Sequence, residues 1–169
     1  NCLYDCRYCF LQGMYQSAHY VLFVNYEDFH KEIREIAARK SCIQPHFFSG
    51  YDCDSLAMDP VTGFSGPFLD LFTEIPHALL EIRTKSTQVR SLLNREPIAN
   101  CVVAFSFTPE PVSRTLEHKV PSIERRINAL SRLSAHGWPI GLRFDPMIYE
   151  DNYRSNYQEL FDRIFSVVN

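Results

Sequence analysis

Residues 2–10 read Cys-Leu-Tyr-Asp-Cys-Arg-Tyr-Cys-Phe, and this stretch holds three of the six cysteines of the chain. Their spacing is C-x3-C-x2-C, so Cys2, Cys6 and Cys9 lie on one short loop and can serve a single centre. A closed structural zinc site needs four protein ligands, usually as paired C-x2-C units. A cubane 4Fe–4S cluster is normally held by four cysteines, so three leave one iron open to an outside ligand. The spacing therefore favours a catalytic 4Fe–4S cluster.

Two alternatives use the same three cysteines. A zinc knuckle would need a fourth ligand, for which the sequence offers Cys42, Cys53 or His19. A disulfide would leave one of the three thiols idle, and no secretory signal is visible to favour a disulfide framework. We expect Cys42 and Cys101 to be structural, because Cys101 lies in an apolar stretch where a thiol behaves as a small hydrophobic group.

The composition is that of one globular domain over residues 1–169, which we expect to be part of a longer chain. The chain is 46% hydrophobic and 14% aromatic, which is too apolar for a disordered protein. A net charge of −3 does not indicate a strongly basic nucleic-acid binder, although a local basic groove stays compatible with it. The longest apolar stretches, 20–24 and 101–107, are far shorter than the ~20 residues of a membrane span. We therefore expect a cytoplasmic protein with no membrane partner.

Helical and strand patterns alternate after the cysteine loop. Helices are expected over 25–39, with Asn25 as the N-cap, and over 66–75, 86–94, 121–135 and 154–168; short buried strands are expected over 45–49, 78–84, 100–107 and 140–144. This alternation predicts βαβ units around a parallel sheet, which either opens as a doubly wound fold or curls toward a barrel. In both, functional residues gather at the carboxyl ends of the strands. The sequence places residues 50–54, Lys85, Ser106 and Asp145 at such ends.

The string CLYDCRYCFLQGMYQ, with an aromatic residue just before the last cysteine, resembles the signature of radical S-adenosylmethionine (SAM) enzymes. Within that group it is similar to the spore photoproduct lyase family. The resemblance implies an α/β fold, a partial (β/α)6 TIM-like barrel of the radical SAM type, with residues 1–169 as its core domain. The first and last strands, and a C-terminal portion that helps hold DNA in the lyases, would then lie outside this sequence.

The resemblance also implies the chemistry. Cys2, Cys6 and Cys9 match the ligands of a 4Fe–4S cluster, whose open iron is chelated by the amino and carboxylate groups of SAM in this family. One electron, from a donor such as flavodoxin or ferredoxin, then yields a 5′-deoxyadenosyl radical. The implied substrate is the spore photoproduct, a thymine dimer in DNA, and such a lesion would have to leave the base stack.

Several further residues match family positions. Those expected to bind the cofactor are Tyr8 (adenine), Gly50 and Asp52 (methionine amino group), Lys85 with Arg83 as a rival (methionine carboxylate), and Ser106 (carboxylate or ribose). Cys53 follows Cys9 by 44 positions and matches a non-ligand cysteine that returns a hydrogen atom to the repaired thymine radical. With Tyr8 it completes the expected catalytic pair.

Two positions depart from the family pattern. The lyases carry a Tyr after the last cluster cysteine, implicated in relaying the radical from the thiol, and Phe10 has no hydroxyl for that task. They also carry an Ala-Pro segment where this chain has Arg143 and Asp145. We expect Asp145 either to pair with Arg143 in a bidentate manner or to bind a ribose hydroxyl. Three functions stay open: a DNA repair lyase, a family member with another substrate, and a zinc-stabilised binding module without catalysis.

Overall fold

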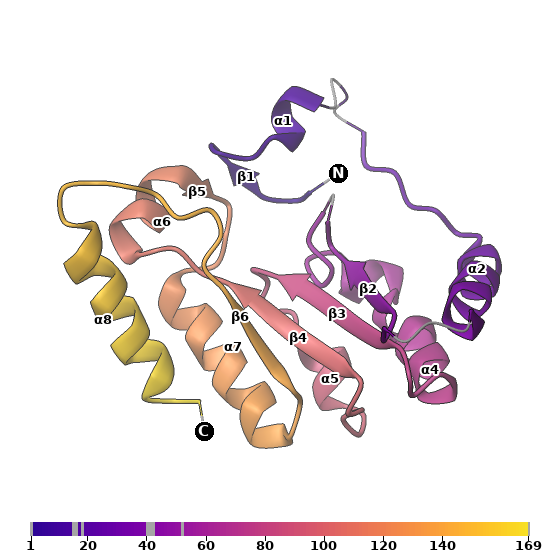
Figure 1. Cartoon of the computed structure of the whole chain (residues 1–169). Coiled ribbons are helices and arrows are strands. Elements are labelled where there is room, and N and C mark those ends of the chain that lie inside the picture. The colour runs from indigo at the N-terminus through magenta and orange to yellow at the C-terminus, as the bar shows by residue number, and fades with distance from the viewer. Residues whose placement is uncertain (1, 15–16, 18, 40–42, 52, 169) are drawn as a thin grey trace.

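The computed structural model describes residues 2–14, 17, 19–39, 43–51 and 53–168. Its centre is a parallel sheet of four strands in the order β2–β3–β4–β6 (Figure 1). The strands are β2 (His46–Ser49), β3 (Leu79–Thr84), β4 (Cys101–Ser106) and β6 (Ile140–Arg143). Their order in the sheet follows their order in the chain, with no point where the order reverses. A doubly wound sheet has such a point, so this sheet is the wall of a partial barrel, and the expected fold class is confirmed.

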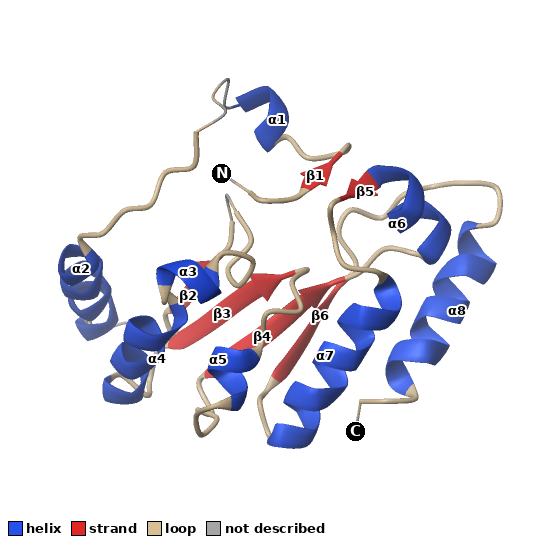
Figure 2. Ribbon diagram, turned by 180° about the vertical axis from the view of Figure 1, so that it is seen from behind, coloured by secondary structure: helices blue, strands red, loops and turns tan. Residues whose placement is uncertain are grey.

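The helices cover one face of the sheet. Figure 2 shows α4, α5 and α7 across this face, with α2 and α8 towards the two edges. The longer helices are α2 (Tyr26–Ala38), α4 (Ser65–Glu74), α7 (Ile123–His136) and α8 (Tyr153–Phe165), and the short ones are α1 (Leu11–Met14), α3 (Asp59–Thr62), α5 (Arg90–Leu93) and α6 (Glu110–Leu116). Across the described segments, no helix has the length and apolarity that crossing a bilayer requires.

The hydrophobic core fills the space between the sheet and these helices. Alternate strand residues, including Ile82 and Phe105, are buried there against helix residues such as Phe72 and Leu130. The intervening residues point to the opposite, open face because side chains alternate along a strand. That face carries Glu81 and Arg83 on β3, Ala104 and Ser106 on β4, and Gly141 and Arg143 on β6. The open face therefore carries charged side chains of β3 and β6 among small and apolar residues, and it leads towards the carboxyl ends of the strands.

Most of the expected elements are present, and two helices differ in detail from what was expected. The helix expected over 86–94 is only α5, because the Ser86 hydroxyl accepts a hydrogen bond from the Gln88 amide at 3.0 Å and holds the chain in a turn. Asn25 is the N-cap of α2, but its side chain donates to the Asp28 carboxylate instead of capping the backbone.

Strand β2 differs from its expected burial. His46 and Phe48 are exposed because they point to the open face of the sheet, beside Glu81 and Arg83, on a strand at its edge. Two further strands were not expected: β1 (Asp5–Cys6) and β5 (Glu117–His118) pair with each other in a separate antiparallel ladder. Two residues are too few to produce a periodic pattern in a sequence.

Gly141 tests the packing of the open face. A β-carbon at Gly141 would lie 3.0 Å from both Ala104 Cβ and Val102 Cγ1, so Gly141→Ala overpacks the sheet. We expect it to lower the free energy of unfolding by about 1–3 kcal/mol, measured by urea denaturation. Gly66→Ala is the matched control, because a β-carbon there meets nothing within 4 Å. It should leave stability unchanged or raise it by up to about 1 kcal/mol. Equal stabilities of the two variants would contradict this packing.

Candidate functional site

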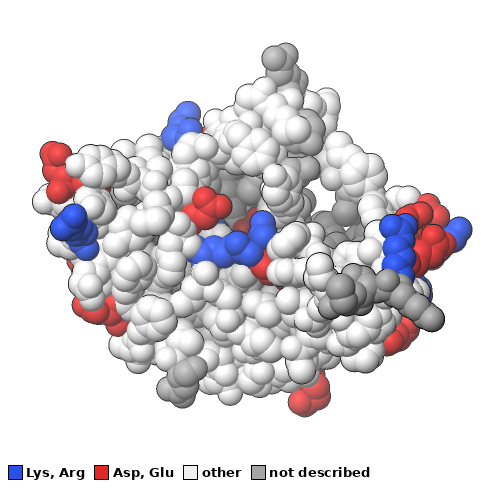
Figure 3. Space-filling model, viewed as in Figure 1, with Lys and Arg blue, Asp and Glu red and all other residues white. Residues whose placement is uncertain are grey.

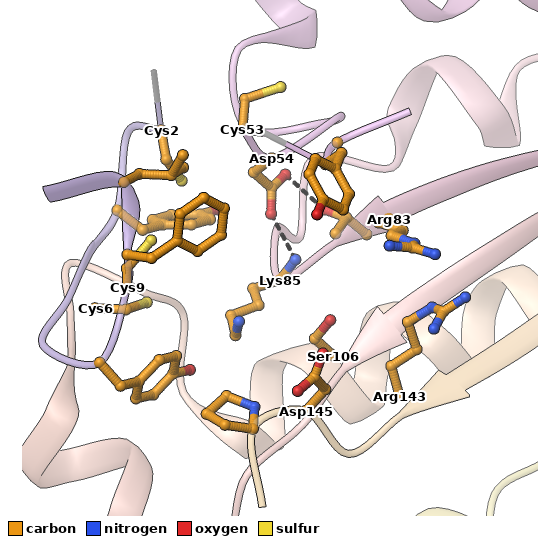
Figure 4. A pocket seen from close by; sticks show the side chains of 18 residues that line it. Cys2, Cys6, Cys9, Cys53, Asp54, Arg83, Lys85, Ser106, Arg143 and Asp145 are labelled. Atoms are coloured by element: carbon orange, nitrogen blue, oxygen red, sulfur yellow. Dashed lines mark hydrogen bonds between the residues drawn. The ribbon is translucent and has the colours of Figure 1, made fainter. Parts of the chain in front are cut away.

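The cysteine loop and the strand ends enclose a cavity of about 380 Å³ (Figure 4). The sequence-predicted residues that line it are Cys2, Cys6, Tyr8, Cys9, Gly50, Cys53, Lys85, Ser106, Arg143 and Asp145, together with the rival Arg83 and the divergent Phe10. Residues from opposite ends of the chain therefore meet in one place. Asp52 and Cys42 lie outside the described residues. Cys101 is buried in β4, and burial raises its pKa to about 12, as a structural thiol requires.

The cysteine loop is joined to the rest of the fold through β5. Cys6 lies opposite Glu117 in the β1–β5 ladder. The Arg7 amide donates to the Leu116 carbonyl at 2.7 Å, and the Cys9 amide closes a turn onto the Cys6 carbonyl at 2.9 Å. These backbone bonds set the positions of Cys6 and Cys9 relative to the carboxyl ends of the strands.

The three thiols of the cysteine loop line the cavity together. Cys6 is buried, and burial raises its pKa to about 11; burial also raises the pKa of the half-buried Cys2. A closed structural zinc site needs four protein ligands, whereas three cysteines can bind three irons of a cubane and leave the fourth open. The donor set and its spacing therefore suit a 4Fe–4S cluster.

A buried carboxylate, Glu117, lies beneath the cysteine loop. It accepts a hydrogen bond from the Tyr8 hydroxyl, and its other oxygen accepts bonds from Ser113 Oγ at 2.9 Å and from Arg126 Nη2 at 2.6 Å. Burial raises the pKa of Glu117, but the charges of Arg126 and Lys85 and these hydrogen bonds outweigh it, so the net pKa is lowered. Burial and the nearby carboxylate raise the pKa of Tyr8. Glu117 is therefore ionised and Tyr8 is neutral.

Neither Glu117 nor Arg126 was predicted as a site residue. Arg126 is fully buried, and its guanidinium also donates to the Ser106 carbonyl at 3.0 Å. The sequence held one signal for it: Arg126 lies on the same face of α7 as the apolar residues Ile123, Ile127 and Leu130. A charged residue on an apolar helix face needs a buried partner, and that partner is Glu117.

Asp54 connects the loop after β2 to the end of β3. Its carboxylate accepts hydrogen bonds from the Lys85 amide at 2.6 Å and the Thr84 hydroxyl at 2.7 Å (Figure 4), and from the Leu56 and Ala57 amides. Burial raises the pKa of Asp54 in spite of these bonds. The bonds fix the backbone beside Cys53, whose side chain is exposed in the cavity lining.

Gly50 allows a close backbone approach, as expected, but the partner is part of the protein. Its φ is +84°, and a β-carbon would lie 2.5 Å from Ser55 Oγ and 2.7 Å from the Arg83 carbonyl oxygen. Any larger residue would therefore push the loop after β2 away from β3.

Arg143 forms its bidentate pair with Glu81 and not with the expected partner Asp145. Arg143 donates from Nε and Nη2 to the two Glu81 oxygens at 2.5 and 2.7 Å, and Arg83 Nε donates to the same carboxylate at 2.7 Å. The small Ala104 and Gly141 lie between the two side chains on the open face, so the guanidinium reaches across β4. Basic and acidic atoms consequently meet in the middle of this face (Figure 3). Asp145 lines the cavity, and its charge adds to the effect of Glu81 in raising the pKa of Arg143.

Arg83 and Lys85 were both expected as partners of the methionine carboxylate, and their contacts place them in different parts of the cavity. The Arg83 guanidinium lies over the Phe48 ring at 4.2 Å and is bonded to Glu81, on the side of the cavity away from the cysteines. The Lys85 Nζ atom lies 3.9 Å from Glu117 and 5.6 Å from the centre of the Tyr8 ring. Lys85 is therefore the cation beside the cysteine loop.

Comparisons with known proteins agree with this geometry. The family model described as spore photoproduct lyase matches residues 1–169. The chain is 22% identical to spore photoproduct lyases of Bacillus subtilis (strain 168) and Geobacillus sp. (strain Y412MC61), over 97% of its own length and 48% of theirs. It thus spans about half the length of these curated relatives.

Solved structures show the same fold. A spore photoproduct lyase complexed with dinucleoside spore photoproduct superimposes with a TM-score of 0.90 at 21% identity, over 97% of this chain and 48% of that one. A double mutant of spore photoproduct lyase with bound AdoMet and dinucleoside spore photoproduct also gives 0.90 at 21% identity, over 96% and 48% of the two chains.

The ion cluster of Glu81 with Arg83 and Arg143 makes the free energy of unfolding depend on pH. Burial raises the pKa of Glu81, but hydrogen bonds from Arg143 and Arg83 outweigh it and lower the pKa. The ionised carboxylate is therefore favoured in the folded state. Its contribution is complete above the unfolded-state pKa of about 4.3 and is lost as the pH falls through the lower folded-state pKa.

Glu81→Gln should therefore cost on the order of 2 kcal/mol of unfolding free energy at pH 7. The difference from the unmodified protein should shrink towards pH 3, as measured by urea titrations across this range. A difference that stays constant over the whole range would show that the Glu81 charge contributes nothing.

Proposed function

Because the chain belongs to the spore photoproduct lyase family, we propose that it is a radical SAM enzyme that reverses the spore photoproduct thymine dimer in DNA or a closely related lesion. One observation carries the proposal: Cys2, Cys6 and Cys9 line the same cavity as Cys53 and Lys85. Cluster ligands, a cation for the cofactor and a hydrogen-atom donor thus share one space. The relative solved with AdoMet and dinucleoside spore photoproduct supports the same two ligands here. Residues 1–169 would form the radical SAM core domain.

In this proposal Cys2, Cys6 and Cys9 hold a 4Fe–4S cluster. When bound, the cluster supplies the electron that cleaves SAM and frees the 5′-deoxyadenosyl radical. A flavodoxin- or ferredoxin-type protein would deliver that electron. The three thiols must stay reduced to bind iron, which suits the cytoplasm.

The remaining residues would bind and orient SAM. Lys85 pairs with the methionine carboxylate, because its ammonium faces the cavity beside the cysteine loop. Tyr8 presents its ring to the adenine while Glu117 holds its hydroxyl. The other contacts proposed are Gly50 and Asp52 with the amino group, Ser106 with the carboxylate or ribose, and Arg143 and Asp145 at the far wall. The protein thus supplies orientation and the cofactor supplies the difficult chemistry.

Cys53 would complete the repair. Its thiol would give a hydrogen atom to the thymine radical left when the lesion fragments, which breaks one S–H bond, forms one C–H bond and leaves the unpaired electron on the Cys53 sulfur. Its exposure at the cavity meets the need for access to a large substrate. The hydrogen bonds of Asp54 fix the adjacent backbone, so the thiol has a defined approach.

A second candidate is a family member that acts on another substrate. Phe10 favours it, since its ring lines the cavity, is 58% exposed and packs against Tyr51 with ring centroids 6.5 Å apart. A phenyl ring at this place makes the wall apolar and offers no hydroxyl to a radical or a substrate.

The cluster assignment predicts the effect of single cysteine substitutions. After anaerobic reconstitution with iron and sulfide, the unmodified protein should bind about four irons per chain and absorb in the visible range. Cys2→Ala, Cys6→Ala and Cys9→Ala should each lose most of both. Cys101→Ala is the matched control and should keep them, because this thiol is buried in β4. Stoichiometric zinc with no visible band would contradict the cluster and favour the zinc-stabilised module.

The hydrogen-donor role predicts a separation of two activities. Cys53→Ala should keep its iron and still cleave SAM, but should lose repaired thymine product from dinucleotide spore photoproduct. Normal product formation by this variant would disprove the donor role. SAM cleavage without any turnover of spore photoproduct by the unmodified protein would instead support the second candidate.

A further inference from the structure

The Glu117 side chain is fully buried and contacts two residues that line the cavity, Tyr8 and Lys85. One oxygen accepts the Tyr8 hydroxyl of the cysteine loop and lies 3.9 Å from Lys85 Nζ at the end of β3. The other oxygen is bonded to Ser113 on α6 and Arg126 on α7. A single carboxylate therefore links two groups that face the cavity to the helices behind it.

The charges around Glu117 do not cancel. Arg126 is fully buried 2.6 Å from the carboxylate and neutralises it. Lys85, at 3.9 Å and with 17% of its side chain exposed, adds a second positive charge to the group. The other cations in the described cavity lining, Arg83 and Arg143, share Glu81, and the charge of Asp145 also acts on Arg143. Asp54, the remaining carboxylate of the described lining, is bonded to backbone amides and the Thr84 hydroxyl. Since Arg126 already balances Glu117, the ammonium of Lys85 can also pair with an anionic ligand in the cavity, and its contact with Glu117 sets its direction.

The position of Tyr8 depends on the same carboxylate. Its hydroxyl is held by Glu117, and its ring centre lies 5.6 Å from Lys85 Nζ. Two groups from distant parts of the chain are therefore fixed relative to each other by one buried side chain.

Building on the function proposed above, we propose that Glu117 is a positioning residue for SAM. It holds the Lys85 ammonium where the methionine carboxylate binds and the Tyr8 ring where the adenine binds, and it touches neither. Lys85 keeps its contact with Glu117 and adds a charge-assisted hydrogen bond to the ligand, because an ammonium has three donors.

Two substitutions separate the effect of the length of the Glu117 side chain from the effect of its charge. Glu117→Asp keeps the counter-charge of Arg126 but withdraws the carboxylate by one methylene from Lys85 and Tyr8. Glu117→Gln keeps the length but leaves Arg126 without a counter-charge, which is costly for a buried ion. If Glu117→Gln yields no folded holoprotein, Glu117→Asp decides the question alone.

The readout is the preference of the cluster-loaded protein for SAM over its decarboxylated analogue. It is expressed as the dissociation constant of the analogue divided by that of SAM, both measured by equilibrium dialysis. Lys85→Met sets the reference, and we expect it to lower the ratio about tenfold, the effect of one charge-assisted bond. Glu117→Asp should bring the ratio to within about threefold of that reference. In the Lys85→Met background it should cause no further loss, as expected for two coupled residues.

A purely structural role would weaken both ligands alike and leave the ratio unchanged. That result for Glu117→Asp would overturn the inference. Glu110→Gln is the matched control: it removes another glutamate charge near the ends of α6, one that pairs with Arg114 and Arg163, and it should leave the ratio as it was.

Failure of the proposed function looks different. An unmodified protein that takes up no iron, or binds no SAM once loaded, would refute the radical SAM assignment itself. An unmodified protein that does both, with a Glu117→Asp variant of equal preference, would refute only the role of Glu117.

Discussion

The carboxyl ends of four parallel strands must lie along one edge of their sheet, and the candidate site is built on that constraint. Because the strands follow chain order, the helices cover one face and leave the other open. Each loop that follows a strand then delivers its side chains to the same cavity. Ala104 and Gly141 are small and leave room on the open face, so the Arg143 side chain reaches Glu81 across it. Backbone geometry thus decides which residues can act together.

The cysteine loop adds the three proposed iron ligands to this edge, and electrostatic interactions hold it there. A two-residue ladder alone would be weak. The Tyr8 hydroxyl extends the attachment to Glu117, whose charge is balanced by the buried Arg126. Since removing one member of a buried ion pair leaves a charge without compensation, loop, strands and α7 depend on each other. The same arrangement leaves Lys85 as a cation directed at the cavity.

Local patterns in the sequence predict the parts of this architecture that are themselves local. The helix and strand alternation predicts the parallel sheet, and the spacing of Cys2, Cys6 and Cys9 predicts that they meet in one place, which the cavity lining confirms. The pairings that failed are long-range. Glu81 lies 62 positions from Arg143, whereas the expected partner Asp145 lies two positions away. Glu117 and Tyr8 are 109 positions apart, so neither residue signals the other. Sequence patterns cannot identify contacts that only the folded sheet creates.

The central claim is that three cysteines hold a cluster with one iron open to SAM beside the strand ends. Electron paramagnetic resonance of the reconstituted and reduced protein tests it most directly, with spectra recorded before and after SAM is added. The account predicts a signal from a reduced 4Fe–4S cluster that changes on addition of SAM, because the cofactor binds the open iron. A cluster signal that SAM leaves unchanged, or a protein that carries zinc and gives no signal, would contradict it.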